Sequence, residues 1–395
     1  MTAITAGAPA GARMGRARVA VSLAFLAFGT QLGLWFAHLP VVAARLALQP
    51  GQIGLALLSI GVIGLVMQPL AGLAIVRFGS RRTAMLLLPA FIVTIGFLIN
   101  SPTVPLFFVF AALVGLVGTP ANIANTTLAS EFEKLHGRPI MSMFHGFFSL
   151  GGLVGSLLGG LLISQGWGNG QGAIVVDLVL LAVGLWATSR ALDIAPQPRL
   201  PAQGPRFALP VAALLGICFL AFVCNLIEGS VGDWGALYLA TVKLSGPAVA
   251  ASGYAMFSVA MTILRFAGGP IVERLGRRTL ITGGGVIMAV GLLVVVLAPW
   301  ALLSAMGFLV VAVGASNISP VLTSASANTP GVAPSVGIGA LATSMTLGLL
   351  AGPPIIGFVA QAWGLGVGLM LVAAMGVVVA VGAAVRRWDA VAVPA

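Results

Sequence analysis

The sequence predicts an all-α polytopic membrane protein with twelve transmembrane helices in two pseudo-symmetric six-helix bundles. Three observations lead to this fold class. Apolar residues make up 59% of the 395 residues and charged residues only 7%, whereas about a quarter of a soluble domain is charged. Apolar stretches of about 20 residues, long enough to cross roughly 30 Å of hydrocarbon as helix, fill almost the whole chain. A short motif near residue 75 also returns half a chain later.

The apolar stretches define the individual helices in order. The first follows a basic segment and superficially resembles a secretory signal, but its apolar run is too long and eleven more follow, so we interpret it as an uncleaved helix. A segment rich in proline and polar residues at 191–206 predicts a linker between the two halves. We therefore expect an N-terminal tail at 1–17, bundles at 18–190 and 207–385, and a C-terminal tail at 386–395. The twelve expected spans are 18–43, 53–76, 83–101, 104–130, 139–165, 171–190, 207–240, 249–272, 279–298, 301–327, 336–361 and 366–385.

The net charge of +11 reflects orientation in the membrane and does not require a nucleic-acid partner. Most of the 19 lysine and arginine residues fall on the side of the membrane that holds both termini. Cytoplasmic loops carry an excess of such residues, so we expect both termini in the cytoplasm and the chain in a bacterial-type inner membrane. Arg45 and Lys243 fall on the outer side, and Arg265 falls within a span.

The repeated motif shows that one unit has been used twice. GLAIVRFGSRR, which starts at Gly72, returns as GPIVERLGRRT, which starts at Gly269, an offset of 197 residues. The offset also relates Pro50 to Pro247 and Gly151 to Gly348. Six spans return a chain to its starting side, so the two halves have the same orientation. The recurring motif positions are Gly72, Arg77, Gly79, Arg81 and Arg82 in the first copy, and Gly269, Glu273, Arg274, Gly276, Arg277 and Arg278 in the second.

These motif residues resemble the loop signature of the major facilitator superfamily. The segments MSMFHGFFSLGGLVG from Met141 and IEGSVGDW from Ile227 look like the MosC-like group within it, and more distantly like fucose-permease-like carriers. In the superfamily, the acid and arginines of the motif help to hold the cytoplasmic side shut. The second copy keeps an acid at Glu273, but the first has Val76 there and Ser80 in place of an arginine. The resemblance therefore implies a weaker first-half latch, unless both loops serve mainly as topology anchors.

Ionisable and amide side chains inside the spans are the candidate substrate and proton-coupling residues. Such groups are costly in a bilayer, so they usually face a cavity or a partner. Glu228 in the seventh span is the leading candidate for a proton site, and Gln31 is its counterpart in the first half. Arg265 in the eighth span corresponds to Gln68 in the second. Two structural alternatives remain. Arg265 could extend to the cytoplasmic face, and Glu228 could have no role in transport and simply form a hydrogen bond that stabilises a helix kink.

Further candidates lie in the fourth, fifth and seventh spans. Asn122 and Asn125 could bind a hydroxylated solute or join helices, and His145 could relay protons or simply pack. Asp233, beside Trp234, could attract cations in an outer vestibule, although Trp234 is typical of a headgroup-level anchor. Asp177 in the sixth span is expected to be interfacial. The glycines that follow Gly151 are most simply explained by close helix packing.

The predicted function is transport. The first hypothesis is a proton-coupled secondary carrier that moves a small polar organic solute by alternating access and works as a monomer. The alternatives are a proton-driven drug or metabolite exporter, and a sensor or scaffold that does not transport. The sequence has no metal-spaced His/Cys cluster, nucleophile elbow or phosphate loop, so we expect no enzyme activity, metal or cofactor.

Overall fold

The computed structural model describes residues 10–136, 140–168, 170–191, 212–332, 334–386 and 388. All regular structure in these residues is helical, and twelve helices are long and apolar enough to cross a membrane, as the sequence predicted. The first half contains α1 (Ala10–Arg45), α2 (Pro50–Phe78), α3 (Ser80–Ile99), α4 (Val104–His136), α5 (Met141–Leu162), the short η1 (Ile163–Trp167) and α6 (Gln171–Arg190). The second half contains η2 (Ala212–Leu214), α7 (Leu215–Thr241), α8 (Pro247–Phe266), α9 (Gly268–Leu297), α10 (Ala301–Ala315), α11 (Ile318–Ala327), α12 (Pro334–Trp363) and α13 (Leu365–Val385).

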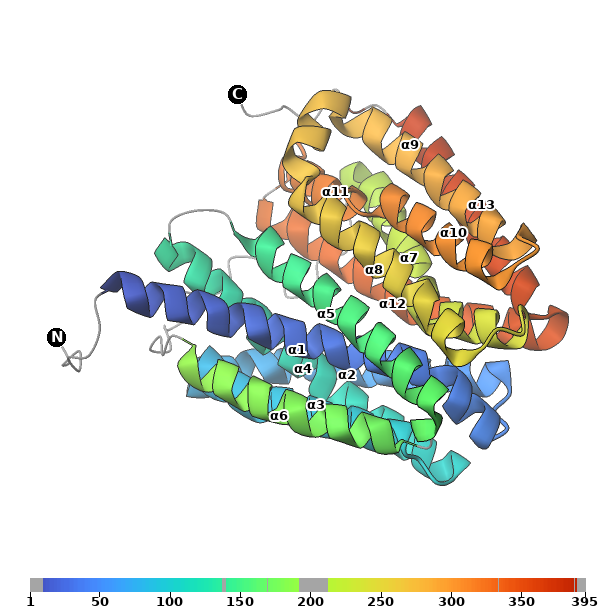
Figure 1. The fold of residues 1–395 in the computed structure, drawn as a ribbon. Helices are drawn as coiled ribbons and strands as arrows, with labels where there is room; N and C mark the ends of the chain where they lie inside the picture. The colour runs from blue at the N-terminus through green and yellow to red at the C-terminus, as the bar shows by residue number, and fades with distance from the viewer. Residues whose placement is uncertain are drawn as a thin grey trace.

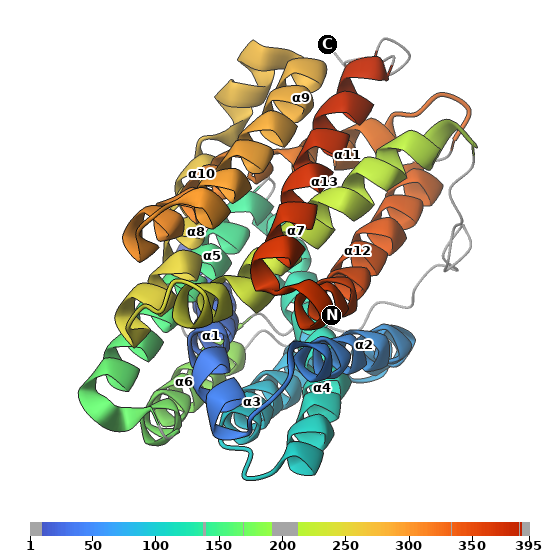
Figure 2. The same ribbon diagram turned by 90° about the vertical axis from the view of Figure 1, so that its right-hand side faces the viewer.

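The helices form two bundles that lie side by side, α1–α6 in one and α7–α13 in the other (Figures 1 and 2). We call the face at which α1 begins and α13 ends the terminal face, and the other the opposite face. In the second bundle α10 and α11 together form one span, Ala301–Ala327. Most of the linker expected at 191–206 lies outside the described residues, as do most of the tails.

The motif glycines form the same turn in both bundles. Gly79 has φ 86° and ψ 153°, and Gly276 has φ 71° and ψ 162°. This backbone conformation is open essentially to glycine alone, because a Cβ atom clashes there. Each glycine changes the chain direction between two helical segments at the terminal face. The repeated Arg-x-Gly therefore marks a specific turn and not only a basic loop.

The second copy of the motif departs from the expected helix boundaries. The eighth span was expected to reach residue 272, but α8 ends at Phe266, and residues from Gly268 onward already belong to α9. Gly269, Glu273 and Arg274 thus lie on the first turns of α9, before its break at Gly276. In the first half, by contrast, α2 continues without interruption to Phe78.

Glycines on α5 bring helices from both bundles close to it. A Cβ atom at Gly155 would overlap the carbonyl oxygen of Thr30 on α1, and one at Gly152 would lie 3.0 Å from the ring of Tyr254 on α8. In the second bundle, a Cβ atom at Gly348 of α12 would overlap the Phe222 carbonyl of α7. The close-packing interpretation of these glycines is therefore confirmed.

The two basic residues at the opposite face have a structural role. Arg45 at the end of α1 donates to the carbonyl oxygens of Ile99 and Ser101, at 2.5 and 3.1 Å. Lys243, just after α7, donates to those of Val296 and Ala298, at 2.9 and 2.6 Å. Cations stabilise helix C-termini, where carbonyls lack helical partners. Each cation therefore caps the third helix of its own bundle.

The bundles contact each other closely toward the opposite face. The amide of Gly51 donates to Gln361 Oε1 at 3.2 Å, which joins the start of α2 to the end of α12. Ser156 Oγ of α5 donates to the Ala251 carbonyl of α8 at 2.5 Å. The ribbons of the two bundles diverge toward the terminal face (Figure 1). The structure is thus one in which the bundles meet at the opposite face.

Candidate functional site

An ion pair joins the two leading candidates from the sequence. Glu228 lies midway along α7, and Arg265 lies in the last turn of α8. Glu228 Oε2 and Arg265 Nη2 are 3.8 Å apart, and the two side chains are 18% and 22% exposed, respectively. The guanidinium is therefore directed to the acid, and Arg265 does not extend to the terminal face. Opposite charges in such a position attract more strongly than on a soluble protein's surface, because water screens them less.

Two serines extend this pair to other helices. Arg265 Nη1 donates to Ser149 Oγ on α5, in the other bundle, at 3.3 Å. Ser319 Oγ on α11 donates to Glu228 Oε1 at a long 3.5 Å. The polar cluster thus contains groups from both bundles, so a relative movement of the bundles would change it.

Tyr254 and His145 lie in the surroundings of the cluster. Tyr254 on α8 contacts the ring of Phe36 on α1 edge-on at 4.6 Å, and lies within electrostatic range of Glu228 and Arg265. His145 on α5 packs edge-on against Phe25 at 5.6 Å and lies within electrostatic range of Arg265. Sequence reasoning singled out His145 but missed Tyr254, although Tyr254 is one of only two tyrosines.

The structure corrects the interpretation of Gln31 and Asp177. Gln31 is completely buried inside the first bundle. Its Nε2 donates to Asp177 Oδ1 at 2.9 Å and is 3.2 Å from the Ile92 carbonyl oxygen. Asp177, expected to be interfacial, is only 7% exposed. Gln31 therefore belongs to a polar contact between α1, α3 and α6, away from the surface shared by the two bundles.

The amides of α2 and α4 do not join the ion pair. Gln68 is half-buried and Asn122 is exposed, and neither has a contact to Glu228 or Arg265 among the described residues. Asn125 is buried, and neither of its amide atoms has a hydrogen-bond partner within the described chain. An unsatisfied buried amide costs free energy, which makes Asn125 a candidate for a bound polar group.

Asp233 and Trp234 also differ from expectation. Asp233 is half-buried on α7 and lies within electrostatic range of Tyr254, which places it on the side of the cluster toward the opposite face. Trp234 is 0% exposed, so its interpretation as a headgroup-level anchor is wrong. Exposed tryptophans at the opposite face are instead Trp167 and Trp363, the last residues of η1 and α12, and Trp300, between α9 and α10.

The motif arginines hold the turns to the last helix of each bundle. Arg81 donates to the Ser189 carbonyl of α6 at 2.5 Å, and Arg278, its counterpart, donates to the Ala384 carbonyl of α13 at 2.7 Å. Arg277 also contacts Ser324 of α11 at 3.4 Å.

The first copy has an acid that the motif itself lacks. Ser80 Oγ donates to Glu131 Oε2 on α4 at 2.5 Å. Glu273 of the second copy is exposed and forms no ion pair within the described residues. The loss of the acid at Val76 therefore does not leave the first turn without a carboxylate. The weaker first-half latch stays a prediction.

Within the described residues no three His, Cys, Asp or Glu side chains lie close enough to bind a metal ion together. The arrangement offers a carboxylate, a guanidinium and hydroxyl groups that come from both helical bundles. These groups can bind a proton and hydrogen-bond a polar solute, and their helices belong to two different bundles. Fold and site together define a membrane transport protein of two six-helix halves.

The family follows from sequence comparison. Residues 19–272 and 234–394 match the model of the Major Facilitator Superfamily, and the chain belongs to this family of secondary transporters. It is 34% identical over 373 residues to an uncharacterized MFS-type transporter of Yersinia pestis, covering 93% of this chain and 94% of that protein. It is 28% identical over 370 residues to the membrane protein MosC of Rhizobium meliloti, covering 91% and 88%. The resemblance to this group is confirmed.

Solved structures share the fold. The nucleoside transporter NupG superposes with a TM-score of 0.72 at 13% identity, covering 94% of this chain and 98% of that one. A bacterial homolog of the human lysosomal transporter Spinster, in an inward-facing conformation, superposes with a TM-score of 0.68 at 13% identity, covering 92% and 95%. At these identities the similarity concerns the fold alone.

Proposed function

We propose that the protein is a proton-coupled secondary carrier that moves a small polar organic solute by alternating access, with Glu228 as the proton-binding group. The observation that carries this proposal is the ion pair between Glu228 and Arg265, which also reaches Ser149 of the other bundle. Protonation of Glu228 removes its negative charge and with it the attraction to Arg265. Arg265 is then free to bind the solute or to change its contact with α5.

The polar groups around the pair suit a hydroxylated solute. Ser149, Ser319 and Tyr254 can each donate or accept a hydrogen bond, and His145 adds a ring nitrogen. Substrates of such carriers bind near the bilayer midplane between the repeats, and Glu228 lies midway along its helix. The solute pathway would continue above and below this level along the polar side chains of Gln68, Asn122, Asn125 and Asp233.

The terminal face would be the cytoplasmic one in this proposal. The excess of basic residues there favours that orientation in a bacterial inner membrane. The contacts of Gly51 with Gln361 and of Ser156 with Ala251 then close the outer side. Rocking of the bundles about α5 and α8 would open it, and one chain supplies both halves, so a monomer suffices.

The experiment begins with a search for the solute. The purified protein is heated with sugars, inositols, nucleosides and amines, because a bound solute raises the unfolding temperature. The solute found is then used in proteoliposomes with and without a proton gradient. We expect Glu228→Gln to lose uphill accumulation driven by the gradient but to retain exchange of labelled for unlabelled solute.

Asp177→Asn is the matched control. It also replaces a buried carboxylate by an amide, but Asp177 contacts Gln31 inside the first bundle. Its amide oxygen can still accept from Gln31, so accumulation should persist. Normal uphill transport by Glu228→Gln would refute the assignment of the proton site, and loss of exchange as well would show that Glu228 is needed for solute binding.

A further inference from the structure

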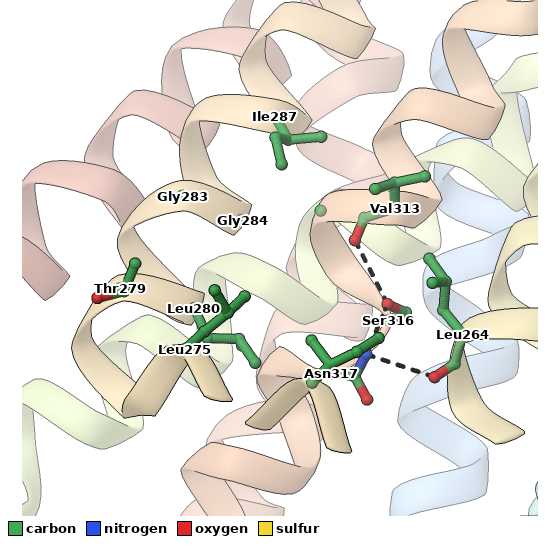
Figure 3. Close-up of a pocket in the computed structure, with 12 residues that line it drawn as sticks. Leu264, Leu275, Thr279, Leu280, Gly283, Gly284, Ile287, Val313, Ser316 and Asn317 are labelled. Atoms are coloured by element: carbon green, nitrogen blue, oxygen red, sulfur yellow. Dashed lines mark hydrogen bonds between the residues drawn. The ribbon is translucent and has the colours of Figure 1, made fainter. Parts of the chain in front are cut away.

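A cavity outside the candidate site lies between α8, α9 and α10 in the second bundle (Figure 3). Its volume is about 270 Å³. Its walls are mainly aliphatic, with Leu264 from α8, Leu280 and Ile287 from α9, and Val313 from α10. Asn317 and Ser316 lie at its α10 side and hydrogen-bond each other at 3.1 Å.

The cavity opens toward the outside of the bundle. Leu275, Ile287 and Val313 line it and are exposed. The helices that α9 chiefly contacts, α10 and α13, both belong to its own bundle. Beyond Ile287, the exposed residues of α9 continue with Val290, Leu293 and Leu297. An exposed aliphatic stripe on a membrane-spanning helix faces lipid. The medium at the mouth of the cavity is therefore hydrocarbon.

Gly283 creates part of the space. It lines the cavity, and a Cβ atom placed on it would have no atom within 4 Å. Neighbouring Gly284 differs, because a Cβ atom there would lie 2.6 Å from the Gly314 carbonyl oxygen. Gly284 thus allows α9 and α10 to approach each other, whereas Gly283 leaves open volume that a larger side chain could fill.

An arginine stands in sequence among the lining residues of α9, just before the turn at Gly276. Arg274 is exposed, and it follows Ile271 by three residues and precedes Leu275, both of which line the cavity. Residues spaced by three or four share a helix face, so Arg274 projects from the same face of α9 as Ile271. Arg277 and Arg278 contact Ser324 and Ala384. Arg274 forms neither a hydrogen bond nor an ion pair within the described residues.

We propose that this cavity binds one acyl chain of an anionic phospholipid, whose phosphate is held by Arg274. The aliphatic walls suit the chain, and the guanidinium at the level of the membrane surface suits the headgroup. The bound lipid would also be connected to the candidate site through Asn317 and the backbone of α8. Asn317 Nδ2 contacts the carbonyl oxygen of Leu264 at 3.4 Å, and Leu264 directly precedes Arg265.

The test measures lipid retention by the purified full-length protein. Palmitoyl-oleoyl phosphatidylglycerol and the corresponding phosphatidylcholine are titrated in detergent, and bound lipid is counted by native mass spectrometry. Removing one arginine near the surface should weaken binding of the anionic lipid about fivefold. Arg274→Gln is therefore expected to lower affinity for phosphatidylglycerol to about that for phosphatidylcholine. Gly283→Leu should weaken both lipids, because it fills the cavity.

Arg77→Gln is the matched control, since Arg77 occupies the equivalent motif position in the first half and lies over the Phe78 ring at 5.4 Å. It should bind as the wild type does. Glycerol phosphate, which lacks acyl chains, should not displace the lipid. Equal losses in Arg77→Gln and Arg274→Gln would indicate diffuse surface attraction and overturn the proposal. Wild-type retention by a folded Gly283→Leu protein would also overturn it. Arg274 is exposed, so its variant tests the proposal even if Gly283→Leu fails to fold.

Discussion

Two glycines on α9 should respond to alanine in opposite directions. A Cβ atom at Gly276 or at Gly283 would have no atom within 4 Å, so neither substitution creates a clash with another residue. Gly276 has φ 71° and ψ 162°, outside the helical region, whereas Gly283 lies in the continuous helical part of α9. The two substitutions therefore differ in backbone conformation and not in packing.

The magnitudes follow from that difference. Holding alanine in the conformation of Gly276 costs about 1–3 kcal/mol, and the reduced entropy of the unfolded chain offsets about 0.4–1 kcal/mol of this. We expect Gly276→Ala to lower the free energy of unfolding by about 1–2 kcal/mol. Gly283→Ala should raise it by roughly 0.5–1 kcal/mol, because alanine is the better helix former.

The assay is unfolding of the purified protein by titration with a denaturing detergent, followed by loss of helix signal. Both variants are compared with the wild type at the same lipid content, since a lipid in the cavity beside Gly283 would add its own stabilisation. A change of the same sign in both variants would refute the argument that the Gly276 turn requires glycine.

Other contacts lead to two more predictions. Lys243→Met removes two charged hydrogen bonds, and Arg45→Met removes the same pair in the other bundle. Each should lower the free energy of unfolding by about 2 kcal/mol, and their effects should add within about 0.5 kcal/mol because they share no partner; a larger deviation would contradict independent caps. Glu131→Ala removes the acceptor of the Ser80 hydrogen bond, and Glu273→Ala removes the motif acid that in the superfamily helps to hold the cytoplasmic side shut. Each should increase labelling of cysteines introduced on α4 and α11 from the terminal face. Val76→Ala should not, and equal labelling in all three variants would show that the acids have no role in closure.

The fold was largely predictable because its signals are local. The length of an apolar stretch predicts a span without knowledge of the rest of the chain. The prolines and the motif glycines likewise affect only the few residues around them, and α2 and α8 begin at Pro50 and Pro247. The end of α8 was missed although a local signal marks it. Residues 249–272 contain few polar side chains, which favoured one continuous span. Gly268, Gly269 and Pro270, shortly after Phe266, are nevertheless the glycine and proline signal of a helix end.

The site was predictable only in part. Glu228 and Arg265 stood out because ionisable groups within spans are rare, and the structure brings them together. Gln31 was misplaced because its contact, Asp177, lies 146 residues away in sequence, and helix rotation decides which face it occupies. Ser149 and Ser319 are common residues whose importance appears only through their contacts.

The caps at the opposite face show what selection has preserved since the gene was duplicated. The accepting carbonyls, Ile99 and Ser101 in one copy and Val296 and Ala298 in the other, keep the repeat offset of 197 residues. The donor has changed from arginine to lysine and moved by one position along the chain. Aligning the two halves by residue identity would pair Arg45 with Val242 and miss the equivalence. In this protein the contacts at the helix ends therefore preserve the relation between the two halves better than the identities of the residues at equivalent positions do.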